Sequence, residues 1–391
     1  MRVEYTNTRL RIMNIGCKFL QAFLWSLLPA AGIAAVVLVW WPGWLLGLLY
    51  LASLLLIENL IFWTGILTVY MTSVQLGIRW RVIGLLCGWI PVLNIWALCR
   101  IISMVKREYA FETEKLSDMQ NQKNADLCKT KYPVLLIHGV FFRDSKLINY
   151  WGRVPKYLEA LGAEIYFGEH SSAASVAESG REIAKKIKAI VQDTGCEKIN
   201  IIAHSKGGLD ARYAAACTDA KEYIASVTTV NTPHRGCAFA DYLLSEIPTH
   251  IQQSVAKKYN HAAQKFGDSN PDFLAAVKDL TASACEQRNQ ELPDVPEIFY
   301  QSTGSKINKA TSGKFPLNVT YHFVKKFDGE NDGLVSVASM RWGEAFHFAA
   351  VPKGRGISHA DMIDANRENI VGFDIRKFYE TILSGLKLRG L

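Results

Sequence analysis

Two long apolar runs set the first part of this chain apart from the rest. Residues 19–41 carry no charged side chain, and residues 44–70 carry only Glu58. Each run can cross a hydrocarbon core of about 30 Å, which requires about 20 helical residues. Tryptophans gather where the two runs meet, as is typical of the membrane–water interface. The pattern predicts two transmembrane helices, and the length of the first run argues against a cleaved signal peptide.

A third apolar stretch, about residues 82–102, is interrupted by Pro91 and Asn94. It either crosses the membrane or enters it and returns to the same side. Basic residues precede the first run and follow the second and third, whereas the join at 41–44 has none. If basic flanks stay in the cytoplasm, the third stretch re-enters and the rest of this multi-pass membrane protein is cytoplasmic. A third full crossing is the alternative and would place it outside.

After residue 110 the hydropathy pattern changes. Residues 111–131 are polar and predict a helical extension that fades into a linker. Residues 132–391 alternate short apolar runs with segments of helical periodicity, which predicts an α/β domain with a doubly wound, mainly parallel sheet. Residues 237–295 are largely helical and form a predicted insertion between strands, and an amphipathic helix over about 362–385 closes the chain. The membrane region at 1–110 is predicted to be all-α.

The charge distribution and the cysteine content limit which binding partners and which redox compartment the sequence predicts. The formal net charge is +8, and residues 1–131 hold 13 basic against 7 acidic side chains, whereas residues 132–391 hold 31 against 29. The basic excess therefore flanks the apolar runs, where it would meet anionic lipid head groups, and no nucleic-acid partner is predicted. The eight cysteines show neither metal-ligand spacing nor a disulfide framework, which agrees with a reducing compartment.

One stretch carries a recognisable chemical motif. The segment "INIIAHSKGGLDARYAAA", residues 199–216, predicts a buried strand, a tight turn and a helix. Ala203 and Gly207 beside Ser205 are small enough for a crowded corner that keeps the serine hydroxyl exposed. This pattern is typical of a nucleophile elbow, with Ala203 in place of the usual first glycine. A serine at such a corner needs a histidine base and a carboxylate to act as a nucleophile.

In this type of fold the acid and the base follow the serine in that order. Three histidines follow the predicted insertion, and His359 in the glycine-rich loop "GRGISHADMID" is the predicted base. His322 and His347 lie in strand-like runs, which favours structural roles. Asp332, directly before a Gly-Leu-Val strand signal, is the predicted acid in preference to Asp328.

Two backbone N–H groups must stabilise the oxyanion that forms during acyl transfer. We predict one from Lys206, directly after the serine, and one from Val140, in the loop after the first strand. A lysine is tolerated there if its side chain points away. It is not the predicted base, because adjacent side chains diverge at such a corner. His138 and His204 are predicted to pack or form hydrogen bonds rather than to catalyse.

Six segments, taken in order, resemble the bacterial triacylglycerol lipases of the α/β-hydrolase superfamily. They are "YPVLLIHGV", "IIAHSKGGLDARY", "VNTPHRG", "LTASACEQRNQ", "NDGLVS" and "SHADMID". The resemblance covers about residues 132–385 and leaves residues 1–110 unmatched. It implies that the insertion at 237–295 is a lid.

The resemblance also implies roles for individual residues. Ser205 would be the nucleophile, Asp332 the acid and His359 the base, with the oxyanion donors already assigned. Some relatives bind a structural calcium ion beside the catalytic histidine. Asp361 matches one of its ligand positions, but a second acid is not identified, so calcium stays open and no other cofactor is predicted.

The leading hypothesis is a membrane-anchored serine ester hydrolase that cleaves acyl lipids through a Ser-His-Asp triad and an acyl-enzyme. Its predicted partners are an acyl-lipid substrate and the lipid bilayer. A phospholipase or a lipid acyltransferase with the same triad is an alternative. A catalytically silent lipid-binding or scaffolding protein is an alternative of another class.

Overall fold

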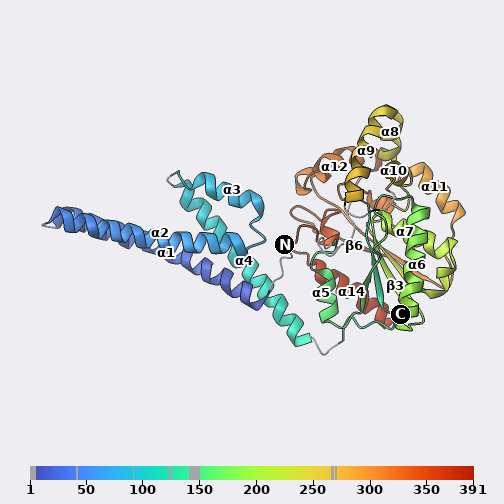
Figure 1. Cartoon of the computed structure of the whole chain (residues 1–391), viewed down its shortest axis with the longest axis horizontal. Helices are drawn as coiled ribbons and strands as arrows, with labels where there is room; N and C mark the ends of the chain where they lie inside the picture. Colours follow the sequence, from blue (N-terminus) through green and yellow to red (C-terminus); the bar gives the residue numbers. More distant parts are fainter. Residues whose placement is uncertain are drawn as a thin grey trace. The chain divides into compact units, whose positions relative to one another are not determined.

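The chain folds into two compact units, residues 1–121 and 122–391 (Figure 1). We describe them from a computed structural model, which describes all residues except 1–5, 41–42, 91, 123–125, 141–149, 266–267 and 269–270. Helix α4 (Leu93–Gln122) continues through the first half of the segment 111–131, as the helical extension described above. An ion pair between Lys115 and Asp118, one turn apart on α4, accompanies this extension.

The first unit contains two long apolar helices, α1 (Asn7–Trp40) and α2 (Trp44–Thr72). Both are long and apolar enough to cross a membrane, and only 6% of the residues in the most apolar window of each are buried inside the protein. Trp25, Leu28 and Trp44 are each at least 80% exposed. An apolar surface that the protein itself leaves uncovered is a typical site of membrane contact.

The third apolar stretch is divided between two helices. Its first part lies in α3 (Gly77–Cys87), which has 11 residues and is too short to cross a bilayer. Its second part opens α4, whose first turn contains Asn94. Pro91 lies outside the described residues. Over the part of the chain that the structure describes, only α1 and α2 satisfy the length and apolarity of a span. Residues 88–90, between α3 and α4, are not helical.

Glycines allow α1 and α2 to approach closely. A Cβ atom on Gly16 would lie 2.8 Å from the side chain of Thr68, and one on Gly65 would lie 2.8 Å from the side chain of Leu20. Small residues of this kind are typical of helix crossings in membranes. The core of this unit forms from buried side chains of α1, α2, α4 and the turn before α3, namely Leu10, Met13, Cys17, Leu20, Ile66, Val69, Leu76, Leu98, Ile101, Ile102 and Val105.

The second unit is built around a six-stranded sheet in which every strand pair is parallel. The predicted α/β fold with a mainly parallel sheet is therefore confirmed. The strand order is β2-β1-β3-β4-β5-β6. In chain order the strands are β1 (Val134–Ile137), β2 (Ile165–Phe167), β3 (Ile199–His204), β4 (Ile224–Val230), β5 (Phe299–Ser305) and β6 (Ala345–Ala349).

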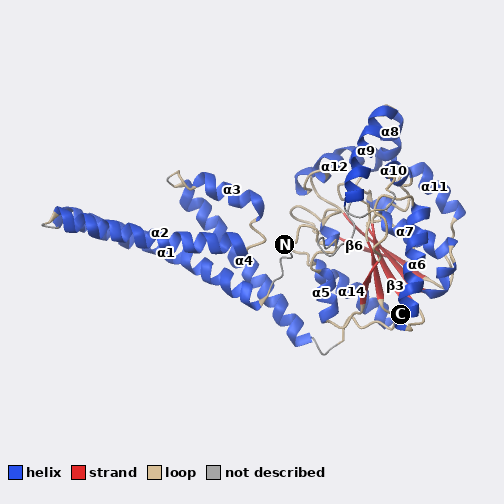
Figure 2. Ribbon diagram, in the orientation of Figure 1, coloured by secondary structure: helices blue, strands red, loops and turns tan. Residues whose placement is uncertain are grey.

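Helices cover both faces of this sheet, as Figure 2 shows. Helices α5 (Val154–Ala160) and α14 (Ile375–Leu388) lie on one face, and α6 (Val176–Thr194) and α7 (Lys206–Cys217) lie on the other. Every residue of the central strands β1, β3 and β4 is consequently buried.

Helix α6 shows how local sequence defines an element. Ser175 and Glu178 form a reciprocal capping box at its start, and Gly195 ends it in the left-handed conformation with φ of 71°. Ile183, Ile187 and Ile190 recur at helical spacing along this helix and are buried in the core.

Three local predictions were wrong. The run around His322 forms helix α12 (Leu317–Asp328) instead of a strand, because its buried side chains recur at helical spacing. The Gly-Leu-Val segment after Asp332 forms a turn. The closing helix is α14, which begins after a capping aspartate, Asp374, and not near residue 362.

The helical insertion lies between β4 and β5. It consists of α8 (Ala238–Glu246), α9 (Thr249–Lys265), α10 (Phe273–Lys278) and α11 (Ala282–Glu291). These helices fall within the insertion predicted at 237–295.

The order of the strands determines where a site can form. The chain passes from β1 to β2 and then returns to place β3 on the other side of β1. The carboxyl ends of β1 and β3 therefore lie side by side at the point where the winding direction reverses. Ligands of doubly wound sheets bind in the crevice at such a point.

The close approach of α1 and α2 generates a prediction. We expect Gly16→Val to lower the melting temperature of the full chain in detergent, since the new side chain would collide with Thr68. Such overpacking costs about 1–3 kcal/mol. Gly32→Val on the same helix is the matched control, because nothing lies within 4 Å of its Cβ position. Thermal unfolding followed by circular dichroism compares the two, and equal melting temperatures would contradict the packing described.

Candidate active site

Ser205 occupies a sharp corner between β3 and α7. Its φ of 56° is unusual for a residue with a side chain. A Cβ atom on Gly207 would lie 2.3 Å from the carbonyl oxygen of His138, and one on Gly208 would lie 2.1 Å from the hydroxyl oxygen of Thr232. The two glycines are therefore required by the close packing of this turn. The geometry matches the strained strand-to-helix turn of a nucleophile elbow.

Hydrogen bonds hold the backbone of this corner. The Ser205 N–H donates to the carbonyl oxygen of Val230 at 2.9 Å. The Ser205 carbonyl oxygen accepts from the hydroxyl of Thr232 at 2.8 Å and from the N–H of Gly208 at 3.1 Å. Contacts to the neighbouring strand and its following loop thus maintain the strained backbone.

The predicted acid and base form a buried pair. Asp332 is fully buried, and its Oδ2 accepts a hydrogen bond from His359 Nδ1 at 2.7 Å and another from the Asn231 side chain at 2.6 Å. Its Oδ1 accepts from the N–H groups of Leu334 at 2.9 Å and Val335 at 2.8 Å. These four bonds offset the cost of burying a carboxylate. Because Asp332 accepts from Nδ1, the other ring nitrogen of a neutral His359 is left as the acceptor.

The His359 imidazole also lies beside the elbow. Its ring centroid is 4.4 Å from that of His204, the residue that directly precedes Ser205. Its backbone N–H donates to the carbonyl oxygen of Asp332 at 3.0 Å, which holds the two loops together. The structure therefore brings the three residues of the predicted triad to the same edge of the sheet.

His204 is part of the packing of the site. The Tyr150 hydroxyl accepts a hydrogen bond from the Gly139 N–H at 3.0 Å and forms a 2.7 Å hydrogen bond with His204 Nδ1. Burial, and secondarily the nearby His359, hold the pKa of His204 well below its ordinary value. This neutral, hydrogen-bonded histidine agrees with the structural role predicted for it.

The loop after β1 packs directly against the nucleophile residue. A Cβ atom on Gly139 would lie 2.8 Å from that of Ser205. Val140 follows Gly139 and is buried. Val140, the predicted oxyanion donor on this loop, therefore directly follows the glycine that packs against Ser205.

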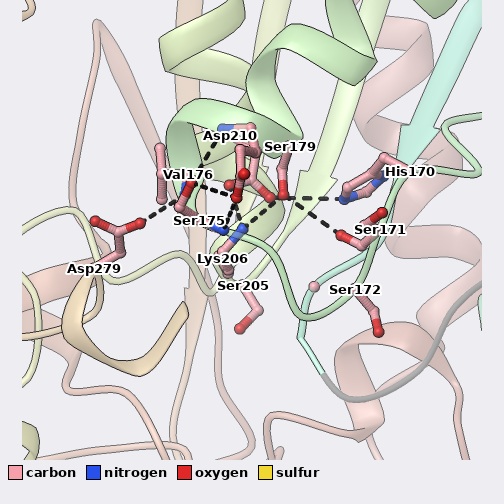
Figure 3. A network of polar contacts seen from close by, with 12 residues as sticks. His170, Ser171, Ser172, Ser175, Val176, Ser179, Ser205, Lys206, Asp210 and Asp279 are labelled. Atoms are coloured by element: carbon pink, nitrogen blue, oxygen red, sulfur yellow. Dashed lines mark hydrogen bonds and ion pairs between the residues drawn. The ribbon is translucent and has the colours of Figure 1, made fainter. Parts of the chain in front are cut away.

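Lys206 begins α7, so its backbone N–H has no partner within the helix. Its side chain lies on the opposite side of the turn from that of Ser205 (Figure 3). The ammonium group donates to Asp210 Oδ1 at 2.7 Å and to the Ser179 hydroxyl at 3.0 Å. Burial raises the pKa of Asp210 to about 6, and the charge of Lys206 opposes this rise. The long side chain points away from the serine, as the sequence required, but into the core.

The remaining candidates have other partners. Asp328 accepts from the N–H groups of Ala238 and Phe239 at the start of α8. His347 lies on β6, and its Nε2 is 3.2 Å from the Gln301 side-chain oxygen. Both residues anchor neighbouring elements.

The carboxylate of Asp361 is bound by an arginine and a serine side chain. Its carboxylate accepts two hydrogen bonds of 2.9 Å from the Arg355 guanidinium and further bonds from Ser358. A cationic side chain already neutralises it. Within the ranges that the structure describes, no three metal-ligating side chains converge.

Sequence reasoning missed two residues of the site. Asn231 directly follows β4 and bonds to Asp332, 101 positions away. Tyr150 connects the loop after β1 to His204. An asparagine at the carboxyl end of a central strand is a signal that could have found the first. Nothing local in the sequence marks the second.

The parallel sheet, the elbow and the buried Asp–His pair are the features of an α/β-hydrolase. A lipase from Staphylococcus hyicus shares this fold, with a TM-score of 0.51 at 20% identity over 67% of this chain and 97% of that chain. Residues 168–268 match a family model described as "Putative serine esterase (DUF676)".

Curated relatives identify the family. The triacylglycerol lipase of Pseudomonas fragi is 30% identical over 250 residues, which cover 56% of this chain and 85% of the relative. That of Pseudarthrobacter phenanthrenivorans is 33% identical over 176 residues, or 42% of this chain. The chain spans about half the length of this relative and of another from Burkholderia plantarii. The chain belongs to the triacylglycerol lipase family.

The hydrogen bonds of Asp332 and His359 separate them from the other candidates. We expect Asp332→Asn and His359→Ala each to lower the turnover of a short-chain nitrophenyl ester by about three to four orders of magnitude. The first variant loses the carboxylate that orients the histidine, and the second loses the base itself. Asp328→Asn and His347→Ala are the controls and should cost less than about tenfold. Equal losses for His347→Ala and His359→Ala would show that the base has been misassigned.

Proposed function

We propose that this chain is a membrane-anchored serine ester hydrolase that cleaves acyl lipids through Ser205, His359 and Asp332. The observation that carries the proposal is the buried 2.7 Å hydrogen bond between Asp332 and His359 Nδ1, located beside a strained serine corner. Membership of the triacylglycerol lipase family supports the reaction class and the acyl-lipid substrate.

The mechanism follows from the contacts of these side chains. His359 Nε2 removes the proton of the Ser205 hydroxyl as its oxygen attacks the ester carbonyl carbon. Asp332 keeps Nδ1 protonated and stabilises the imidazolium that forms. The carbonyl oxygen of the ester becomes an oxyanion, which the N–H groups of Lys206 and Val140 stabilise.

The tetrahedral intermediate then collapses. The C–O bond to the alcohol breaks, and the imidazolium returns its proton to the leaving oxygen, which leaves an acyl group on Ser205. Water deprotonated by His359 attacks this acyl-enzyme, and a second tetrahedral intermediate releases the fatty acid. Both halves use the same base and the same oxyanion donors.

The two exposed apolar helices support membrane anchoring. Tryptophans at their join, Trp40 and Trp44, are 81% and 80% exposed, as interfacial side chains would be in the isolated protein. A lipase held at a bilayer would meet its acyl-lipid substrates there.

The proposal predicts that Ser205→Ala removes both fluorophosphonate labelling and ester hydrolysis, since no other hydroxyl occupies the elbow. Circular dichroism and the melting temperature should stay near those of the wild type, because only one hydroxyl is lost. Labelling of the Ser205→Ala variant at the wild-type rate would refute the assignment. Failure of the wild type to react with esters or the probe would favour a silent lipid-binding protein.

We also propose that the catalytic unit is cytoplasmic. Basic residues near the start of α1 and after α2, such as Arg11 and Arg79, support a hairpin whose ends both face the cytoplasm. The division of the third apolar stretch between α3 and α4 supports a segment that does not cross completely.

A membrane-impermeant maleimide tests this orientation in cells. In a variant without native cysteines, Asn121→Cys at the exposed end of α4 should label only after permeabilisation. Gly43→Cys, in the join between α1 and α2, is the matched control and should label in intact cells. Labelling of Asn121→Cys before permeabilisation would contradict the cytoplasmic placement.

A further inference from the structure

Two opposite charges are fully buried directly behind the predicted nucleophile. The side chains of Lys206 and Asp210 are each 1% exposed and lie on successive turns of α7. Burying a charge is costly unless it is paired and its remaining hydrogen-bonding groups are satisfied. The Ser179 hydroxyl of α6 accepts a further hydrogen bond from the ammonium group, which ties the first turn of α7 to its neighbouring helix (Figure 3).

The pair extends to the other side of the site. Asp210 Oδ2 lies 3.6 Å from His170 Nε2. The His170 ring stacks on that of His138 with 3.9 Å between centroids and 12° between planes. His138 Nε2 is also 3.2 Å from the carbonyl oxygen of His170. The contacts therefore run continuously from the elbow to the loop that follows β1.

Both ends of this chain of contacts carry a predicted oxyanion donor. At one end, Lys206 supplies its own backbone N–H. At the other, His138 is two residues before Val140 and one before Gly139, which packs against Ser205. A single buried polar network thus connects the two separate segments that must be held in register.

The geometry does not suit Lys206 as the base. Its ammonium group is engaged by Asp210 and Ser179, and its side chain leaves the turn on the side opposite to that of Ser205. The lysine side chain therefore anchors the backbone that carries the predicted donor and does not act as the base.

We propose that Lys206 and Asp210 are positioning residues that hold the two oxyanion donors in register, one directly and one through His170 and His138. The inference rests on the proposed ester hydrolysis and deepens it. Donors must lie about 2.7–3.1 Å from the place where the oxyanion forms, and donors fixed beforehand need no rearrangement during the reaction. Displacement of a donor weakens the stabilisation of the transition state more than it weakens the binding of the ester.

The test uses the full chain in detergent. We expect Lys206→Met and Asp210→Asn each to lower kcat by about 10- to 100-fold with little change in KM. A trifluoromethyl ketone binds serine hydrolases as an oxyanion, so its inhibition constant should rise by the same factor as kcat/KM falls. Lys186→Met, on α6, removes an exposed ion pair to Glu169 in the loop before this helix. It is the matched control, with kinetics expected within twofold of the wild type.

A double variant separates positioning from simple stability. Lys206→Met/Asp210→Leu replaces both charges by apolar side chains, which is often neutral or stabilising for a buried pair. We expect its melting temperature to return to within a few degrees of the wild type while kcat and ketone affinity stay low. If a single variant fails to fold, the double variant still tests the inference.

Three results would overturn the inference while leaving the proposed function intact, and the first two concern kcat. One is a wild-type kcat in Lys206→Met, and the other is recovery of kcat together with the melting temperature in the double variant. Equal losses in ester binding and in ketone binding would overturn it as well. A wild type without ester turnover or fluorophosphonate labelling would instead overturn the proposed function, and the inference with it.

Discussion

The site depends on one steric constraint, the crowding of the turn between β3 and α7. The backbone of Ser205 adopts a φ of 56°, and the positions of Gly207 and Gly208 leave no room for a Cβ atom. This turn lies where β1 and β3 are adjacent and the winding of the sheet reverses. Strand order therefore determines where the serine is presented, and close packing determines how.

Two buried polar clusters flank this turn and satisfy their charges differently. On one side, Asp332 is held by side-chain and backbone donors, including Asn231 and His359. On the other, Lys206 and Asp210 neutralise each other. Each cluster connects loops from several strands, so the packing of the whole sheet contributes to the position of a few atoms.

The sequence was most informative where local chemistry decides structure. The elbow pattern and the alternation of strands and helices both depend on neighbouring residues, and the predicted sheet class was correct. Asn231 was not predicted because its partner is 101 residues away. The run around His322 was misassigned because its aromatic and β-branched residues favour a strand, whereas its buried positions follow a helix. Tertiary contacts alone decide such cases.

The acyl-enzyme on Ser205 is the central claim, and intact-mass and peptide mass spectrometry test it most directly. The full chain would be mixed with nitrophenyl butyrate, quenched in acid during turnover and digested. The account predicts a butyryl group on the peptide that contains Ser205. In His359→Ala this group should accumulate at a far lower rate. Ester turnover without an acylated peptide, or a butyryl group on another residue, would contradict the account.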